Sequence, residues 1–224
     1  MRNCLFQDWG RTPYAEAWAR QTKCFEAILA SKADKRPYYH TLVFCEHPPV
    51  LTIGRSGKEE NLLVPRLYLE ERGIEIQRVD RGGDITYHAP GQAVVYPIFD
   101  LEQLGIGLRE YVHALEEIVI GFLRMYGLEG QRLPGATGVW LGVPERPRKI
   151  CAIGVRSSRF VVMHGLALNI NTDLAGFSMI HPCGFTDKGV ASLASELGAV
   201  QDFALAKSRL FSLLADYFQL RVVW

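Results

Sequence analysis

The sequence predicts an α+β fold: a single domain with a central mixed or antiparallel sheet flanked by helices. Short apolar or alternating segments typical of strands occur along the chain, and several are separated by turns of hairpin length. Apolar residues at helical spacing occur near the start, in the middle and at the end of the sequence. No internal repeat, low-complexity tract or Ser/Gly-rich linker divides the chain, so we expect residues 1–224 to form one domain.

The first half of the chain is expected to contain one helix and four strands. Thr12 and Pro13 predict the helix start, with Thr12 as the cap and Pro13 as the first helical residue. One face of this helix repeats at helical spacing, through Trp18, Thr22, Phe25 and Leu29. Residues 74–79 alternate strictly between apolar and polar, which is typical of an amphipathic strand. Three further strands are expected at residues 39–46, 51–53 and 93–99.

The second half of the chain adds three helices and three strands. A central helix is expected where apolar residues share one face, at Leu108, Val112, Leu115, Val119 and Phe122. Gly127 is expected to end this helix, because glycine readily adopts the left-handed conformation of many helix ends. Three successive strands are expected at residues 138–141, 150–156 and 160–171. Two helices are expected to follow, at residues 190–197 and 202–218.

Composition excludes several classes of function. The chain has 224 residues, 48% of them hydrophobic, and a formal net charge of +1 from 25 basic and 24 acidic residues. This balance does not favour binding to nucleic acid or to a membrane surface. The first residues form no apolar targeting segment, and no apolar run is long enough to span a membrane, so we expect a soluble cytoplasmic protein.

The cysteines carry the strongest local indication of chemistry. Five are present and none has the spacing of a metal site or of a disulfide framework, so we expect reduced thiols and no bound metal. Cys183 differs from the others because it lies between Pro182 and Gly184, in a polar segment after a long apolar run. A thiol held on such a turn is accessible to a substrate, which makes Cys183 a candidate nucleophile. A turn residue without chemical function is the alternative interpretation.

A glycine-rich segment at residues 81–92 is a candidate binding loop. Its paired glycines allow the backbone to approach a ligand closely and to present N–H groups to it. Arg81 precedes the glycines, and Thr86, Tyr87 and His88 follow them as polar side chains. The segment does not match the phosphate-binding or dinucleotide-binding glycine motifs. A tight hairpin with solvated polar residues is the alternative.

Lys149 opens a predicted strand after a proline-rich turn. An ammonium that reaches a cysteine favours its thiolate form, so Lys149 is a candidate partner of Cys183, although most lysines at strand ends are merely solvated. Farther along, Gly165 and Ala167 are small residues in an apolar strand. They leave space for an acyl chain or pack beneath a helix.

Taken together, these segments resemble the octanoyl-acyl-carrier-protein:protein N-octanoyltransferases, the lipoyl(octanoyl) transferase (lipoate-protein ligase B) family. The matching segments occur in the order of the family and cover about residues 40–197, at residues 46–55, 81–92, 96–101, 149–156, 163–173 and 182–193. Three positions depart from the family pattern: Asp84 replaces a common Gln, Ala89 a common Gly, and Cys151 a small residue.

The resemblance implies a fold similar to the catalytic domain of biotin and lipoate ligases. It also implies that an octanoyl or lipoyl group passes from acyl carrier protein to Cys183 as a thioester. The group then passes to a lysine of a lipoyl domain, in 2-oxoacid dehydrogenase E2 subunits or the glycine cleavage H protein. No cofactor is implied, and we expect a monomer. Lys149 is expected to assist Cys183, and the expected acyl-binding residues are Arg81, Gly82, Gly83, Asp84, Ile85, Thr86, Tyr87, His88, Ala152, Ile153, Gly154, Gly165, Leu166 and Ala167.

Three alternatives share some of these features. An ATP-dependent lipoate or biotin ligase would have the same fold, but it would require an adenylate site and no thiol nucleophile. A cysteine-dependent amidase would use His164 or His181 as its base. A non-catalytic protein that binds lipoyl domains would leave Cys183 without a chemical role.

Overall fold

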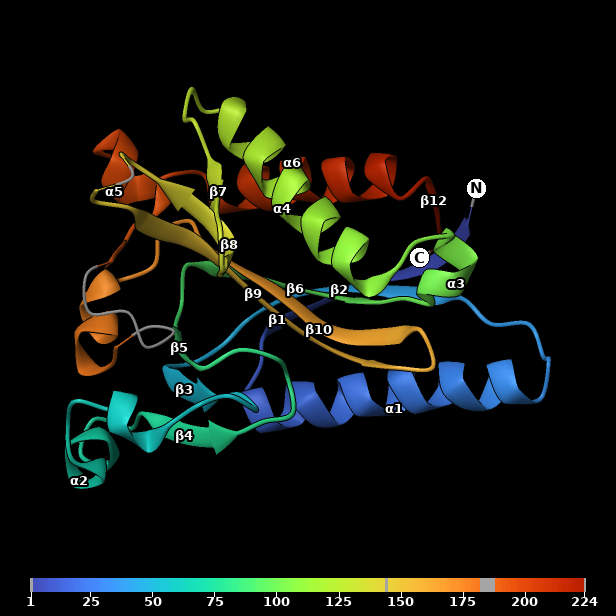
Figure 1. Cartoon of the computed structure of the whole chain (residues 1–224), viewed down its shortest axis with the longest axis horizontal. Helices are drawn as coiled ribbons and strands as arrows, with labels where there is room; N and C mark the ends of the chain where they lie inside the picture. Colours follow the sequence, from blue (N-terminus) through green and yellow to red (C-terminus); the bar gives the residue numbers. More distant parts are fainter. Residues whose placement is uncertain (1, 144, 182–187, 224) are drawn as a thin grey trace.

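The computed structural model describes residues 2–143, 145–181 and 188–223, which form two β-sheets with helices around them (Figure 1). The larger sheet has the order β12 (Leu220–Val223), β1 (Arg2–Arg11), β2 (His40–Glu46), β6 (Gln92–Ile98), β10 (Val161–Asn169), β9 (Arg148–Ser158), β8 (Ala136–Leu141) and β7 (Gln131–Leu133), and β11 (Gly189–Val190) pairs with β9. The smaller sheet has the order β4 (Glu75–Arg78), β3 (Val50–Ile53) and β5 (Ile85–His88).

The larger sheet is mixed. β1 runs parallel to both β2 and β12, whereas β2, β6, β10, β9 and β8 pair antiparallel in succession. Helices lie on both faces of this sheet, so the predicted α+β class with a mixed sheet flanked by helices is confirmed. No helix in the described part of the chain has the length and apolar character needed to cross a membrane.

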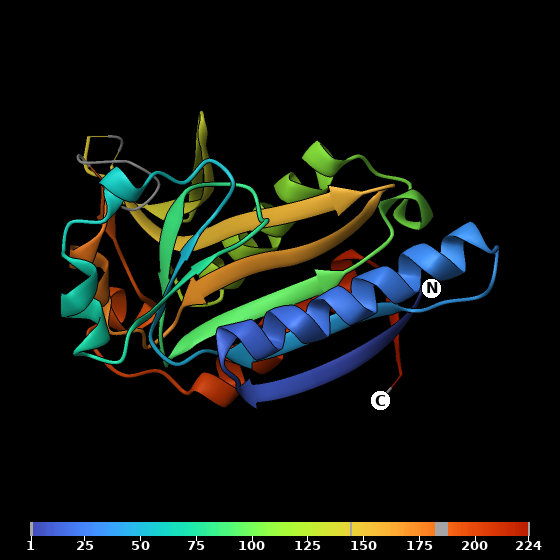
Figure 2. The same ribbon diagram turned by 90° about the horizontal axis from the view of Figure 1, so that it is seen from below.

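Helices α4 (Leu108–Arg124) and α6 (Phe203–Tyr217) cover one face of the larger sheet, and α1 (Tyr14–Ala33) covers the other (Figures 1 and 2). On the first face, Leu115 of α4 and Leu210 of α6 belong to the same core as Val162 and Leu166 of β10. On the second face, α1 packs on the sheet through Phe25 and Ile28. The shorter helices are α2 (Arg66–Glu70), α3 (Leu101–Leu104) and α5 (Leu193–Leu197), with 3-10 turns η1 (Glu59–Asn61) and η2 (Leu174–Met179).

The predicted cap of the first helix is wrong. Helix α1 begins at Tyr14 with Pro13 as its N-cap residue, and the Thr12 hydroxyl instead donates to the carbonyl of Trp9 at 2.7 Å. Thr12 therefore closes the end of β1. The buried stripe of α1 also lies slightly to one side of the predicted stripe, and consists of Tyr14, Ala17, Gln21, Phe25 and Ile28.

The end of α4 is as predicted. Gly127 has a φ of +73°, and its N–H donates to the carbonyl of Arg124 at 3.1 Å. The N–H of Leu128 donates to the carbonyl of Leu123 at 3.1 Å, which completes the hydrogen-bond pattern of a glycine-terminated helix.

Two predicted boundaries are displaced. The last strand of the central hairpin begins at Val161, because Arg159 and Phe160 form the turn with φ values of 47° and 65°. The helix expected from residue 190 begins at Leu193, because Val190 pairs with β9 as part of β11. Ser192 caps this helix by accepting a hydrogen bond from the N–H of Ser195 at 3.1 Å.

Candidate active site

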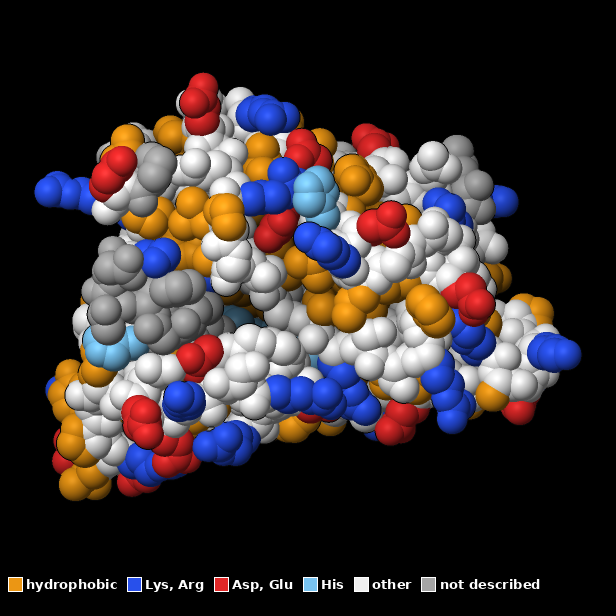
Figure 3. All heavy atoms as spheres, viewed as in Figure 1, with side chains coloured by type: hydrophobic (Ala, Val, Ile, Leu, Met, Phe, Trp, Pro, Cys, Tyr) orange, Lys and Arg blue, Asp and Glu red, His pale blue; other side chains and the backbone are white. Residues whose placement is uncertain are grey.

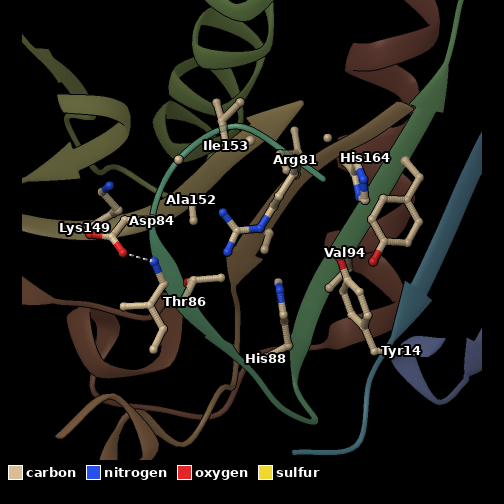
Figure 4. Close-up of a pocket in the computed structure, with 17 residues that line it drawn as sticks. Tyr14, Arg81, Asp84, Thr86, His88, Val94, Lys149, Ala152, Ile153 and His164 are labelled. Carbon is tan, nitrogen blue, oxygen red and sulfur yellow. Dashed lines mark hydrogen bonds between the residues drawn. The ribbon is translucent and has the colours of Figure 1, made fainter. Parts of the chain in front are cut away.

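A pocket lies between the two sheets, on the side of the larger sheet that α1 covers in part. About 510 Å³ in and around this pocket is free of protein atoms, and this space includes its opening to solvent. Figure 3 shows a hollow in this face of the molecule, between the positions of β8 and β3 in Figure 1. The walls come from the loop before β5, from β5 itself, and from β6, β9 and β10 (Figure 4), with Tyr14 at the start of α1.

Most of the predicted site residues line this pocket. They are Arg81, Gly83, Asp84, Ile85, Thr86, His88, Lys149, Ala152, Ile153, Gly154, Gly165, Leu166 and Ala167. Two predicted residues lie elsewhere: Gly82 donates its N–H to the carbonyl of Val155 at 2.9 Å, and the Tyr87 ring packs against Phe177 with ring centroids 5.5 Å apart. Cys183 lies outside the described residues.

The glycines bring the two sheets together. A Cβ atom on Gly154 of β9 would lie 2.7 Å from the carbonyl oxygen of Gly82, in the loop before β5, so the two sheets meet here through main chain. Within the smaller sheet, a Cβ atom on Gly54, which follows β3, would lie 2.3 Å from the carbonyl oxygen of Gly83 in the same loop. Gly165 has the same role within the larger sheet, since its Cβ would lie 2.2 Å from the carbonyl oxygen of Val95. These positions require glycine for backbone packing. The expectation that the Gly82 amide faces a ligand is therefore wrong.

Arg81 holds the glycine loop against β3. Its guanidinium is largely buried, and Nη2 donates to the Thr52 carbonyl at 2.8 Å and to Thr52 Oγ1 at 2.9 Å. Nη1 donates to the carbonyl of Gly82 at 3.0 Å. The guanidinium therefore fixes the loop and forms one wall of the pocket at the same time.

The orientation of His88 is fixed by Gln92. The Gln92 amide nitrogen donates to the Tyr87 carbonyl at 3.2 Å and to Asn169 Oδ1 at 2.8 Å, so its oxygen faces His88 Nδ1 at 2.8 Å. His88 therefore carries its proton on Nδ1, and Nε2 can accept from the Thr52 hydroxyl at 3.3 Å. Burial lowers the pKa of His88 well below its ordinary value, so the ring is neutral at physiological pH.

Lys149 is buried, which excludes the alternative of a solvated lysine at the strand end. Its ammonium donates to the carbonyl of Thr137 at 3.1 Å and lies 4.5 Å from the centre of the Trp140 ring. Only 7% of the residue is exposed. A carbonyl and an aromatic face stabilise the cation while leaving it at the pocket wall.

The described residues on either side of the Cys183 segment have defined positions. Before it, the N–H of His181 donates to the carbonyl of Asn61 at 2.8 Å. After it, Val190 pairs with Lys149 in the parallel β9–β11 ladder. The chain that follows Cys183 therefore returns to the sheet at the lysine.

His164 is a pocket residue that was considered only as the base of an amidase. It is 2% exposed, and its Nε2 lies 2.8 Å from Asp80 Oδ1. Tyr14, Val94 and Tyr96 also line the pocket and were missed. The alternation of β6 places Val94 and Tyr96 on one face and could have indicated them. Tyr14 reaches the pocket through the tertiary position of α1.

The basic side chains of β9 do not form one patch. Arg148 pairs with Glu196 at 2.8 Å, whereas Arg156 pairs with Asp80 near the other end of this long strand. Lys149, between them, is buried. Charges of both signs are interspersed over the face shown in Figure 3.

The comparison with known proteins identifies the family. Residues 13–214 match the model of the lipoyl protein ligase A/B catalytic domain. An octanoyltransferase of Parabacteroides distasonis is 59% identical over 220 residues, which cover 97% of this chain and 100% of that protein. An octanoyltransferase of Bacteroides fragilis is 58% identical over 204 residues, covering 91% of this chain and 92% of that protein.

The chain belongs to the lipoyl protein ligase A/B catalytic domain family. The resemblance to octanoyltransferases, and with it the prediction of an acyltransferase, is confirmed.

Solved structures support the family fold. A bipartite lipoate protein ligase from Thermoplasma acidophilum, solved in a study of this ligase and its E2 lipoyl domain, has a TM-score of 0.72 at 18% identity, covering 100% of this chain and 88% of that one. Lipoate-protein ligase A bound with ATP has a TM-score of 0.70 at 18% identity, covering 100% of this chain and 90% of that one. The predicted likeness to ligase catalytic domains is therefore confirmed.

Two of the three departures from the family pattern have structural roles. The Asp84 carboxylate accepts hydrogen bonds from the N–H groups of Ile85 at 2.7 Å and Lys58 at 3.2 Å, and from Asn61 Nδ2 at 2.6 Å. It therefore ties the glycine loop to the segment that holds His181. Cys151 is fully buried, and burial raises the pKa of its thiol, so this residue is an unreactive part of the core. Nothing in the structure explains Ala89, which is buried beside the loop.

Proposed function

We propose that this chain, as one catalytic domain over residues 1–224, transfers an octanoyl or lipoyl group from acyl carrier protein to a lysine of a lipoyl domain. Cys183 is the proposed nucleophile, and Lys149 is its proposed partner. The observation that carries the proposal is the buried ammonium of Lys149 at the pocket, on a residue whose backbone pairs with the segment that follows Cys183. The similarity of the chain to octanoyltransferases supports octanoyl as the group that is transferred.

In the first proposed step, the Cys183 thiolate attacks the thioester carbonyl carbon of the acyl carrier protein. A new carbon–sulfur bond forms at Cys183, the bond to the sulfur of the carrier breaks, and that sulfur leaves as a thiolate and is protonated. One thioester replaces another, so the step requires no ATP. The ammonium of Lys149 favours the thiolate form of Cys183 before attack and stabilises negative charge as it develops.

In the second proposed step, the amine of the target lysine attacks the Cys183 thioester. A carbon–nitrogen bond forms, the carbon–sulfur bond breaks, and the thiolate of Cys183 is regenerated. The attacking amine must be neutral and loses a proton as the amide forms, so a base has to accept that proton. Lys149, after giving its proton to the departing carrier thiolate, is the proposed acceptor.

The pocket supports a medium acyl chain. Its walls include Ile85, Val94, Ala152 and Ala167, and their aliphatic surfaces match a hydrocarbon chain. Transfer of about seven aliphatic carbons from water at ~0.8 kcal/mol each supplies on the order of 5 kcal/mol, enough to discriminate between chain lengths. A second, smaller cavity shares Thr86, Lys149, Ala152 and Ala167 with the first and continues it towards Phe177.

The partners follow from this chemistry and from the relatives. A structural neighbour of the chain was solved in a study of a ligase and its E2 lipoyl domain, which supports a lipoyl domain as the acceptor. The E2 subunits of 2-oxoacid dehydrogenases and the glycine cleavage H protein are the proposed acceptors. Acyl carrier protein is the proposed donor, and the proposed enzyme is a cytoplasmic monomer without a bound cofactor.

Mass spectrometry of the intact protein tests the nucleophile. Incubation with octanoyl-acyl carrier protein, without an acceptor, is expected to add one octanoyl group to the wild-type chain and none to Cys183→Ser. Cys24→Ser is the matched control and should keep the adduct, because Cys24 is a partly exposed free thiol on α1, outside the pocket. Loss of the adduct in the control, or its survival in Cys183→Ser, would contradict the proposal. A requirement for ATP would indicate a ligase.

A further inference from the structure

The backbone of β8 departs from regular strand geometry beside Lys149. Gly138 has a φ of +117°, which residues with a side chain rarely adopt, and a Cβ atom there would lie 2.4 Å from the carbonyl oxygen of Cys151. The register of β8 on β9 also shifts between Val139 and Trp140, and it places Trp140 opposite Lys149. Irregularities of this kind often direct a group towards a functional site.

The peptide unit between Thr137 and Gly138 is held from two sides. Its carbonyl, from Thr137, accepts a hydrogen bond from the Lys149 ammonium at 3.1 Å. Its N–H, from Gly138, donates to Glu116 Oε1 at 3.0 Å. The peptide bond is trans, so the carbonyl and the N–H point in opposite directions. One peptide unit therefore connects the carboxylate of Glu116 to the ammonium of Lys149.

Glu116 is itself held in place. It belongs to α4, which packs beside β8 (Figure 1), and only 8% of the residue is exposed. Its other carboxylate oxygen, Oε2, accepts from Arg132 Nε at 3.0 Å. The two oxygens thus have different partners, and the one that faces Gly138 cannot turn away without losing both contacts. Glu116 does not line the acyl pocket.

The two hydrogen bonds strengthen each other. A peptide N–H that donates to a carboxylate leaves more negative charge on the carbonyl oxygen of the same unit, which makes that oxygen a better acceptor. The side-chain nitrogen of a lysine carries N–H groups whether it is protonated or neutral, so Lys149 can donate to the Thr137 carbonyl in both states. The contact therefore persists while Lys149 gives up and regains a proton.

We propose that Glu116 is a positioning residue for Lys149, and that it holds the ammonium at the pocket wall through the Thr137–Gly138 peptide. The inference rests on the proposed function and adds to it a residue from outside the pocket. Glu116 acts by fixing the orientation of the peptide, so its role requires an acceptor that reaches the Gly138 N–H. A negative charge that does not reach this N–H would not be sufficient.

Glu116→Gln and Glu116→Asp separate reach from charge. Glutamine keeps an oxygen at the distance of the Gly138 N–H, and Arg132 keeps its bonds to Glu117 at 2.7 Å and to the carbonyl of His113 at 3.2 Å. Aspartate keeps the carboxylate but is one methylene group shorter. The positioning role predicts that the glutamine variant behaves as wild type and that the aspartate variant does not. Glu116→Ala, which also lacks an acceptor within reach, repeats the test.

Alkylation of Cys183 by iodoacetamide, followed over a range of pH by mass spectrometry of its peptide, measures the effect. Glu116→Asp is expected to slow alkylation at neutral pH by about 3–10-fold and to move the pH profile upwards, because the ammonium loses its fixed position. Glu116→Gln should remain within about 2-fold of wild type. Glu117→Asp is the matched control and should behave as wild type, because Glu117 pairs with Arg132 and Arg124 on the surface of α4.

A double-mutant cycle with Lys149→Met distinguishes positioning from a general loss of packing. If Glu116 acts through the lysine, Glu116→Asp should have no further effect on alkylation once the ammonium has been removed. A change in packing that reached Cys183 by another route would slow alkylation equally in both backgrounds.

The outcomes distinguish this inference from the proposed function. If Lys149→Met itself leaves the alkylation profile unchanged, the proposed role of Lys149 is wrong. If Lys149→Met shifts the profile, three results would overturn the positioning role. They are wild-type behaviour of both Glu116→Asp and Glu116→Ala, a loss in Glu116→Gln as large as in Glu116→Asp, and an effect of Glu116→Asp that is unchanged in the Lys149→Met background.

Discussion

Lys149 and Val190 are partners in the parallel β9–β11 ladder, and the N–H of Ala191 donates to the Lys149 carbonyl at 2.9 Å. The pairing joins two segments that are far apart in sequence and fixes where the chain after Cys183 meets the sheet. A change in the lysine side chain can therefore be made without removing these backbone hydrogen bonds.

Lys149→Met is expected to reduce acyl transfer by at least about 100-fold, because the apolar stem remains while the ammonium is lost. Alkylation of Cys183 by iodoacetamide should also require a higher pH in the variant, since the thiolate loses its cationic neighbour. Lys23→Met, on the exposed face of α1, is the control. An alkylation profile identical to that of the wild type would remove Lys149 from the proposed mechanism.

Ala152→Leu is expected to shorten the acyl pocket, because Ala152 lines both the main cavity and its continuation. Exclusion of two methylene groups at ~0.8 kcal/mol each changes the preference for octanoyl over hexanoyl by about 10-fold. Competition between the two thioesters measures this ratio directly. Ala204→Leu, exposed on α6, should leave the ratio unchanged. An unchanged ratio in Ala152→Leu would place the acyl chain elsewhere.

The sequence predicted the central strands and the long helices because their burial pattern is local. It did not predict β1 and β12, whose parallel pairing joins Arg2 to Leu220 and is a relation that no local pattern contains. It also missed β5, since Ile85–His88 follow a glycine turn and become a strand only by pairing with β3.

In the candidate site, too, the features carried by local sequence were predicted, and the contacts between distant segments were not. The loop at residues 81–88 and the small residues of β9 and β10 were predicted as neighbours and do line one pocket. The role of Gly82 was wrong, because its amide is used by a strand that sequence order does not place beside it. His164 was not predicted as a pocket residue, because its direction depends on a single backbone angle.

Arg81→Lys is expected to lower the free energy of unfolding by about 1–3 kcal/mol. One ammonium cannot replace a guanidinium that donates to both Thr52 and Gly82 at once. Urea unfolding measures the change. Arg55→Lys, at a neighbouring exposed position, is the control and should have little effect. Equal stabilities of the two variants would show that the hydrogen bonds of the Arg81 guanidinium do not hold the glycine loop in place.

Acid should destabilise the protein through its buried histidines, of which His40 and His47 are two. Burial lowers the pKa of His40 and of His47 from 6.5 to about 4 in the folded state. The unfolded chain binds the protons more tightly, so the stability is fully present above about pH 6.5 and is lost as the pH falls towards 4. Each histidine contributes on the order of 3 kcal/mol at most.

His47→Gln tests this dependence, measured as the free energy of unfolding at a series of pH values between neutrality and pH 4. Its slope with pH should be smaller than that of the wild type. His113→Gln should retain the wild-type slope, because His113 is exposed on α4. A slope unaffected by His47→Gln would mean that its protonation is not linked to unfolding.

The close approach of Gly154 to Gly82 and of Gly54 to Gly83 has a consequence for enzyme engineering. The separation of the two sheets is set by main chain against main chain at Gly154 and Gly82, and the glycine loop meets the end of β3 in the same way at Gly54 and Gly83. Single substitutions at Gly154 or Gly54 therefore disrupt the fold before they reshape the cavity. A library intended to admit bulkier acyl groups should leave these glycines unchanged. It should vary Ala152 and Ala167 of the wall, where new side-chain volume enters the cavity while the backbone keeps its spacing.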